Sequence, residues 1–505
     1  MGKKTAGKNQ QNRNNPNADH RRLPKHKRQE LNNLIEKLLK VTSSCADGPG
    51  LAKLWEAHTE SQFIVDRIQQ IESEIKNPLH TQNRNASLDV FISWLKQHDV
   101  KFDGVKVSQF PEYDLGLEAT KDIKQSSLLL EVPKKIMFTT QCCDVADFKK
   151  LYNTDKLLIN MPNVALAFAL VVERLNKDSF WKPYLDVLPR DYYTVLYYKS
   201  NELQELKGSP SLELALKQCR SIRRQYAYFY KMLWSSSFTL FEKIREKWTY
   251  ELYCWAVSTV MTRQNSVPVG EEGAMVPALI PLWDMANYKD GQITTDYSIE
   301  DQSVQYSALE DYKPGQQIFI YYGERSNAEL LIHNGFVCME NTGDVVNLRL
   351  GVSPSDPLAT SRLRALTNLS LPCGGATTLC VAKNAVPITP QLLAYARVFN
   401  MNKEQLDHWL SSDHIEDLFH IDCALDHELE KKVWTFLLTR LQILLSVYPT
   451  TMEADRLALE SSANSTEISK VEKLSPAKKC AIQLRLSEKI ILKDAIDYVK
   501  QRISA

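Results

Sequence analysis

Apolar residues recur with helical spacing over most of the chain, and strand-like patterns interrupt them in two places. The first two helical segments place their apolar residues on one face, at Leu31, Leu34, Ile35, Leu38 and Leu39, and again at Trp55, Phe63, Ile64, Ile68 and Ile71. Residues 90–97 and most of 141–250 continue the helical pattern, and it returns beyond about 345. A turn is expected at 47–50, where the chain reads Asp-Gly-Pro-Gly.

Short runs of β-branched and aromatic residues predict strands between 88 and 140 and between 276 and 324. The predicted strands are 105–107, 128–132, 293–299, 303–309 and 316–321. Pro314 and Gly315 stand where a type II turn between two strands requires them, and a further turn is expected at 113–117. The aromatic run at 226–230 predicts packing in a core.

The order of these patterns predicts an α+β fold. A chain of 505 residues is too long for one compact core, so two or three domains are expected. We expect a disordered basic tail at 1–28, a helical region at 29–102, a β-rich domain at 103–323 with a helical insert at about 141–250, and a mainly α-helical domain at 345–495.

Charge and composition argue against two classes of partner. The chain has 62 Lys and Arg against 61 Asp and Glu, so a strongly basic surface for nucleic-acid binding is not expected. There is no apolar run of the roughly 18 residues that a membrane helix needs. The N-terminus lacks the apolar segment of a secretory signal, which predicts a cytoplasmic location, and the basic tail leaves a nuclear one open.

The ten cysteines are scattered, and none forms a Cys-x-x-Cys pair. Zinc sites and disulfide frameworks both depend on paired spacing, so the sequence predicts neither. Scattered thiols of this kind are typical of a reducing compartment.

Three segments bring together residues that are unusual in combination. Residues 263–265 read Arg-Gln-Asn, residues 282–288 read Leu-Trp-Asp-Met-Ala-Asn-Tyr, and residues 321–327 read Tyr-Tyr-Gly-Glu-Arg-Ser-Asn. Each is weak alone, since an Asn after an apolar strand is more often a turn residue than a ligand contact. In this order, separated by a hairpin, they resemble the core motifs of the SET-domain methyltransferases.

The resemblance covers roughly residues 85–495 and is to the Rubisco-methyltransferase-type branch, within which the chain is most similar to the actin-histidine N-methyltransferases. It implies a SET domain at about 103–323, S-adenosylmethionine as methyl donor, actin as protein partner, and a C-terminal domain that helps to hold this substrate. The reaction it implies is the transfer of one methyl group to a histidine of actin.

The resemblance also implies a set of cofactor-binding residues: Arg84, Tyr113, Asp114, Leu115, Arg263, Asp284, Met285, Ala286, Asn287, Tyr288, Asn334, Gly335 and Phe336. Guanidinium groups at 84 and 263 would meet the carboxylate of the cofactor, and the residues at 334–336 would close its adenine side. Two positions depart from the family. A tyrosine follows the motif asparagine where histidine is usual, and 114–116 reads Asp-Leu-Gly where Gly-Phe-Gly is usual.

Tyr322 and Asn265 are the expected catalytic residues. Methyl transfer from a sulfonium is an in-line displacement in which positioning supplies most of the acceleration, and it needs no metal. The Tyr322 hydroxyl would orient the acceptor nitrogen. A carboxamide such as Asn265 suits an imidazole, which has one lone pair and one N–H, and Trp283 would stack on the ring. Gln264 and Arg325 are expected to contact the substrate chain.

Two alternatives stay open on the sequence. A protein-lysine methyltransferase of the same fold would line its channel with aromatic residues in place of Asn265. A SET protein that only binds a partner would be expected to lack Tyr322, Asn287 or Arg263, and all three are present.

Overall fold

The computed structural model describes residues 23–44, 50–81, 83–143, 146–269, 273–373, 377–463 and 473–504. Residues 1–22 of the predicted tail and residues 47–49 of the predicted turn lie outside these ranges.

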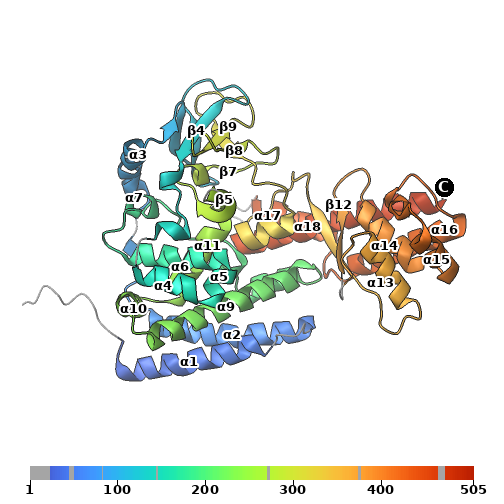
Figure 1. Ribbon diagram of the computed structural model, residues 1–505, viewed down its shortest axis with the longest axis horizontal. Coiled ribbons are helices and arrows are strands. Elements are labelled where there is room, and N and C mark those ends of the chain that lie inside the picture. Colours follow the sequence, from blue (N-terminus) through green and yellow to red (C-terminus); the bar gives the residue numbers. More distant parts are fainter. Residues whose placement is uncertain are drawn as a thin grey trace, which may run out of the picture.

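Three long helices, α1 (Lys25–Ser43), α2 (Leu51–Glu72) and α9 (Ser211–Ser235), pack together along the lower edge of the molecule in Figure 1. Helix α1 includes residues 25–28, which the sequence pattern assigned to the tail. The reason is tertiary: the Arg28 guanidinium lies 4.2 Å from the Trp234 ring centroid and pairs with Glu246 at 2.5 Å. The predicted packing of the 226–230 aromatics is confirmed, since Tyr226 and Phe229 of α9 are fully buried.

Two four-stranded sheets form the β-rich part, drawn at the upper left of Figure 1. The first has the order β1 (Lys101–Phe102), β4 (Leu128–Pro133), β9 (Ser303–Ser307), β8 (Thr295–Ser298), and the second β2 (Val105–Phe110), β3 (Asp114–Ala119), β10 (Gln317–Ile320), β7 (Asn287–Tyr288). A two-stranded sheet adds β5 (Gln264–Val269) and β6 (Ala274–Leu279). The second sheet therefore joins strands from both sides of the helical insert.

Two turn predictions have different outcomes. The type II turn is confirmed: Gly315 has φ +85°, and the Gln316 N–H donates to the Lys313 carbonyl at 3.0 Å. The turn predicted at 113–117 is wrong in its extent, because Asp114 already begins β3. Asp114 keeps the left-handed backbone of a turn residue, with φ +62°, and residues 115–117 continue in β3, which pairs with both β2 and β10.

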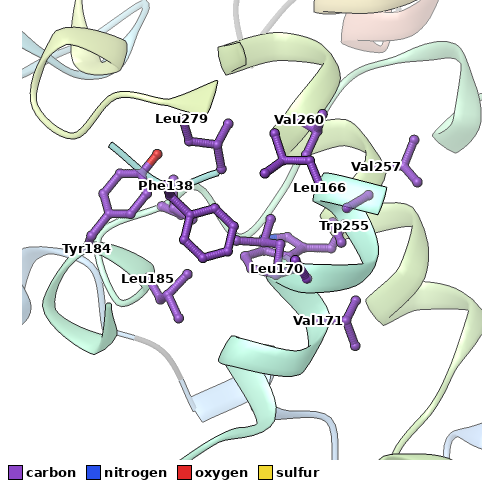
Figure 2. Close-up of a cluster of buried hydrophobic side chains, with 14 of the residues drawn as sticks. Phe138, Leu166, Leu170, Val171, Tyr184, Leu185, Trp255, Val257, Val260 and Leu279 are labelled. Carbon is purple, nitrogen blue, oxygen red and sulfur yellow. The ribbon is translucent and has the colours of Figure 1, made fainter. Parts of the chain in front are cut away.

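Helices α6 (Pro162–Leu175) and α11 (Tyr250–Arg263) of the insert contact the β5–β6 hairpin, and apolar residues of the insert share one main core with those of the sheets. The insert also contains α4 (Ala146–Thr154), α5 (Lys156–Asn160), α7 (Lys182–Leu185), α8 (Ser200–Leu203) and α10 (Thr239–Arg245), and α3 (Leu88–Gln97) lies before the first strand. Figure 2 shows Leu166 and Leu170 of α6 beside Phe138, Leu279 and Trp255. This core anchors the chain on either side of 264–288.

The C-terminal part is mainly helical, as predicted. Its helices are α13 (Ala359–Asn368), α14 (Pro390–Asn400), α15 (Lys403–Ser411), α16 (His427–Ser446), α17 (Met452–Ala463) and α18 (Pro476–Ser504), and a hairpin of β11 (Val345–Leu350) and β12 (Thr377–Ala382) opens it. The α+β prediction is thereby confirmed.

Helix α18 ties the two halves of the molecule together, and in Figure 1 it runs from the centre into the C-terminal part. The buried Glu488 of α18 accepts hydrogen bonds from Ser209 (2.8 Å) and Ser211 (3.1 Å) of the insert and from Tyr448 (2.9 Å) after α16. Among the helices that the structure describes, none is both long and apolar enough to cross a membrane.

Candidate active site

A tight turn carries the segment 282–288 into the space between the sheets and helix α11. Leu282 has φ +70°, a left-handed conformation that a leucine adopts only when its surroundings impose it. The 3-10 turn η7 (Trp283–Met285) follows, and its Met285 and Ala286 are buried. The chain then enters β7, which pairs in parallel with β10.

A buried ion pair lies at the centre of the site. Arg263, the last residue of α11, donates from Nη1 to the carbonyl of Asp284 at 2.6 Å and lies 3.4 Å from its carboxylate Oδ2. The Tyr184 hydroxyl donates to the same Oδ2 at 2.6 Å. Burial raises the pKa of Asp284, and Arg263 opposes that rise. Burial would lower the pKa of Arg263, but Asp284 and nearby tyrosines raise it above its ordinary value, so the guanidinium stays charged.

A second guanidinium lies next to this pair. Arg84 is largely buried, donates from Nε to the Val187 carbonyl at 2.6 Å and forms an ion pair with Asp114. Its pKa is lowered by burial and by repulsion from Arg263. Two guanidinium groups and two carboxylates, Asp114 and Asp284, thus share the site, and Arg263 Nε remains as a buried donor without a partner among the described residues.

Asn287 lies where three strands meet. Its Nδ2 donates to the Leu115 carbonyl of β3 at 3.3 Å and to Gln317 Oε1 of β10 at 2.8 Å. Gly116 allows this approach, because a Cβ on it would lie 2.5 Å from Gln317 Oε1 and 2.8 Å from Asn287 Nδ2.

Three aromatic rings close one side of the site. The ring of Tyr288 lies 5.3 Å from those of Tyr322 and Phe336, measured between centroids. The Tyr322 hydroxyl donates to the Ala286 carbonyl at 3.1 Å, and burial raises the pKa of Tyr322 to about 12. This hydroxyl is therefore protonated at physiological pH, with its lone pairs free to accept.

The residues at 334–336 begin at the last residue of a π-helical turn, η8 (Leu330–Asn334), of a kind often found at functional sites. The Gly335 N–H donates to the Leu330 carbonyl at 2.8 Å, and Gly335 has φ +84°. The Asn334 carboxamide accepts from Arg325 at 2.9 Å. Arg325, predicted to contact substrate, thus also holds Asn334.

Asn265 and Trp283 are not joined to Tyr322 by a hydrogen bond among the described residues. The Asn265 Oδ1 accepts from the Ser266 N–H at 2.8 Å, and the Trp283 indole donates to Thr295 at 2.9 Å. Tyr113 is exposed before β3, with its ring 5.7 Å from that of Phe319.

Four buried polar atoms in this region have no hydrogen-bond partner among the described residues. They are Arg263 Nε, Gln264 Oε1, Asp284 Oδ1 and the Tyr288 hydroxyl. Buried polar atoms are almost always paired, so a gathering of unpaired donors and acceptors fits a ligand that supplies both. A zwitterionic amino-acid group beside Arg84 and Arg263 meets that condition.

Three residues that shape the site were missed by the sequence analysis: Tyr184, Gln317 and Gly116. Tyr184 lies 100 positions before Asp284, and no local pattern links the two. Gly116 carried a signal, since the family turn is glycine-rich, but only the structure shows what its missing side chain accommodates. Among the described residues no group of three or more His, Cys, Asp or Glu is arranged to hold a metal.

Comparison with known proteins agrees with this geometry. A model of the SET domain matches residues 114–323, and one described as Rubisco LSMT substrate-binding matches residues 353–492. Solved structures of Rubisco LSMT share the fold: one bound to lysine and AdoHcy has a TM-score of 0.65 at 22% identity, covering 83% of this chain and 92% of that one. Fold and site together define a SET-domain methyltransferase with a Rubisco LSMT-type C-terminal domain.

Within that class the relatives are more specific. The actin-histidine N-methyltransferases of Homo sapiens and Papio anubis are each 37% identical over 471 residues, which is 92% of this chain and 77% of the relative. That of Gallus gallus is 37% identical over 473 residues. The chain belongs to the family of the actin-histidine N-methyltransferases, which confirms the predicted family.

Proposed function

We propose that the protein transfers a methyl group from S-adenosylmethionine to a ring nitrogen of a histidine in actin. The observation that carries this proposal is the 37% identity over 92% of the chain to proteins named for that activity. The site supports it independently, because it offers two guanidinium groups, unpaired buried polar atoms and a protonated tyrosine in one place.

Arg84 and Arg263 bind the carboxylate of the methyl donor. Both are largely buried, and Arg263 Nε has no partner among the described residues, so it can donate to that carboxylate. A carboxylate between them would relieve the repulsion that lowers the pKa of Arg84. Asp284 acts here mainly through Arg263, which it orients.

The remaining predicted residues surround the rest of the donor. Asn287 takes the amino-acid end, together with backbone groups of Asp114 and Leu115 on β3 and of Tyr113 just before it. The adenine side is closed by backbone and side-chain groups from two segments, residues 284–288 (with Met285, Ala286 and Tyr288) and residues 334–336 (Asn334, Gly335 and Phe336). The ring contacts between Tyr288 and Phe336 support this pairing of the two segments.

When bound, the donor supplies an electrophilic methyl group on a sulfonium. Tyr322 orients the attack: its proton is donated to the Ala286 carbonyl, so its oxygen presents lone pairs toward the reacting atoms. Because burial raises its pKa to about 12, the hydroxyl stays protonated throughout the physiological range. The main contribution of the protein to the reaction rate is that it aligns the acceptor lone pair with the carbon–sulfur bond that breaks.

Asn265 and Trp283 select the acceptor. The acceptor imidazole attacks in its neutral form, which dominates above the ordinary histidine pKa of about 6.5. One ring nitrogen gains the methyl group as the carbon–sulfur bond breaks, and the ring proton on the other nitrogen is then lost to solvent. The Asn265 carboxamide hydrogen-bonds the second nitrogen, while Gln264 and Arg325 contact the flanking chain.

The proposal includes actin as the protein partner. It also includes a cytoplasmic location, with a nuclear location left open. The C-terminal domain that matches the substrate-binding model is the part of the chain expected to contact actin away from the acceptor histidine.

The test combines purified protein, labelled S-adenosylmethionine and unmodified actin, with mass spectrometry to locate the label. We expect one methyl group on one actin histidine, absent when that histidine is replaced by glutamine. Methyl-lysine on another protein with actin unlabelled would overturn the acceptor assignment. Failure to bind S-adenosylhomocysteine in calorimetry would overturn the donor assignment.

A further inference from the structure

The carboxamide nitrogen of Asn287 donates hydrogen bonds to two groups of neighbouring strands. One is the backbone carbonyl of Leu115, 3.3 Å from Nδ2, and the other is the side chain of Gln317, whose Oε1 lies 2.8 Å from the same nitrogen. Gln317 is the first residue of β10, four residues before the Tyr-Tyr-Gly motif and outside it.

The Leu115 carbonyl decides which end of the Asn287 amide faces it. A carbonyl oxygen can only accept, so the amide nitrogen has to be on that side. Gln317 then reinforces the choice, because it presents its oxygen and not its nitrogen to Asn287 Nδ2. Both protons of the amide are thereby used within the protein.

The consequence concerns the other end of the amide. Asn287 Oδ1 accepts no hydrogen bond from any described residue, and Asn287 is only partly buried. An asparagine at this position could offer a ligand either a donor or an acceptor. Here the donor is already occupied, so the group that remains is a hydrogen-bond acceptor, which suits an ammonium and repels a carboxylate.

Gly116 is part of the same arrangement. Its missing side chain leaves the space in which Gln317 Oε1 and Asn287 Nδ2 meet, since a Cβ would stand within 2.8 Å of both. Gly116 opposes Ser108 on β2 in the same sheet, so the position is fixed by strand pairing.

We propose that Gln317 is a positioning residue that sets the orientation of the Asn287 amide, so that Oδ1 receives the ammonium of the methyl donor. This inference rests on the proposed function, since it takes S-adenosylmethionine as the ligand. It adds Gln317, a residue outside the family motifs, to the groups that hold the amino-acid end of the donor.

The test compares Gln317→Leu with Gln317→Glu by calorimetric titration with S-adenosylhomocysteine. Leucine removes the acceptor and frees the amide to rotate, so we expect affinity to fall about tenfold, as for one lost hydrogen bond in a binding site. Glutamate keeps an oxygen that accepts from Asn287 Nδ2, so affinity should stay within about threefold of wild type. If Gln317 had only a structural role, we would not expect the leucine variant to lose affinity while the glutamate variant keeps it.

A deaminated analogue of S-adenosylhomocysteine, which lacks the ammonium, tests whether the loss of affinity in Gln317→Leu depends on that ammonium. We expect Gln317→Leu to bind this analogue as well as the wild type does, because the interaction that Gln317 supports is missing from it. In turnover assays the KM for S-adenosylmethionine should rise in Gln317→Leu while kcat changes little. Gln305→Leu on β9, a partly buried glutamine bonded to Asp301, is the matched control and should behave as wild type.

The outcomes separate the two proposals. Wild-type protein that does not bind S-adenosylhomocysteine overturns the proposed function. Wild-type binding together with equal affinities for Gln317→Leu and wild type overturns only the role of Gln317. An equal loss for the deaminated analogue overturns the assignment of the ammonium. If Gln317→Leu loses its cooperative thermal transition, Gln317→Met takes its place in the same comparison.

Discussion

Asp284 illustrates how single side chains in this site depend on partners from distant parts of the chain. Its carboxylate is buried between Arg263 of α11 and Tyr184 of α7, and one oxygen, Oδ1, is left without a partner among the described residues. Removing Arg263 would leave a buried carboxylate without its ion-pair partner, so we expect the two residues to depend on each other.

Tyr322 is the residue whose removal should affect chemistry most cleanly. In Tyr322→Phe the ring stays packed against Tyr288, so we expect the affinity for S-adenosylhomocysteine to remain within about threefold. The single-turnover rate of methyl transfer should fall about 100-fold, because one oriented hydroxyl is lost at the reacting atoms. Rapid-quench measurements at saturating donor report this rate.

The neighbouring Tyr321→Phe provides the control. Its ring also lies near Tyr288, at 6.2 Å, yet it has no hydrogen bond to the 286–288 segment in the described residues. We expect it to retain wild-type rates. Equal rates for Tyr322→Phe and wild type would remove Tyr322 from the mechanism.

At the scale of elements, the end of the π-helical turn η8 fixes the segment 334–336. Gly335 combines φ +84° with close backbone packing, since a Cβ would lie 2.7 Å from the carbonyl carbon of Tyr193. Both features exclude a side chain, and the second couples the turn to the helical insert.

Gly335→Ala should therefore destabilise the protein by about 2–3 kcal/mol, since it adds a steric conflict to an unfavourable backbone conformation. Gly315→Ala is a matched control, because Gly315 has φ +85° but open space around its Cα. It should cost about 1 kcal/mol, the conformational part alone. Urea unfolding measures both, and equal losses would show that the contact with Tyr193 is unimportant.

At the scale of the whole molecule, Glu488 joins the helical insert to the C-terminal part through three hydroxyl donors. Burial raises the pKa of Glu488 to about 7 from an ordinary value of 4.5, so the folded protein holds its proton more tightly than the unfolded chain. Its contribution to stability is fully present below the unfolded pKa and is lost as pH rises through about 7.

Glu488→Gln cannot ionise and should remove that dependence. We expect the variant to be close to wild type at pH 5 and more stable by about 1–3 kcal/mol at pH 8, from urea midpoints at both values. Glu453→Gln, at the start of α17, is the control, and its stability difference from wild type should be the same at both pH values. A constant difference between Glu488→Gln and wild type from pH 5 to 8 would contradict the raised pKa.

The sequence by itself determined the elements, the fold class and the motif residues. Periodicity and β-type runs identified the segments that became α1, α2 and α3 and the strands β2, β4, β8, β9 and β10, because apolar spacing reflects which face of an element is buried. Pro314 and Gly315 fixed a turn through their own backbone preferences. Tyr322, Asn287 and Arg263 were identified because their neighbours form a recognisable pattern along the chain.

Only the tertiary structure decided how those residues are oriented and supported. The sequence pattern assigned residues 25–28 to the tail, and it is the contact of Arg28 with Trp234 that places them in a helix. Residues 115–117 were expected in a turn and are strand residues that pair with β2, while Asp114 keeps a turn-type φ of +62°. Tyr184 and Gln317 carry no local signal, because their role consists of a hydrogen bond to a residue 100 or 30 positions away. Such contacts depend on the packing of whole elements, which no pattern of neighbouring residues records.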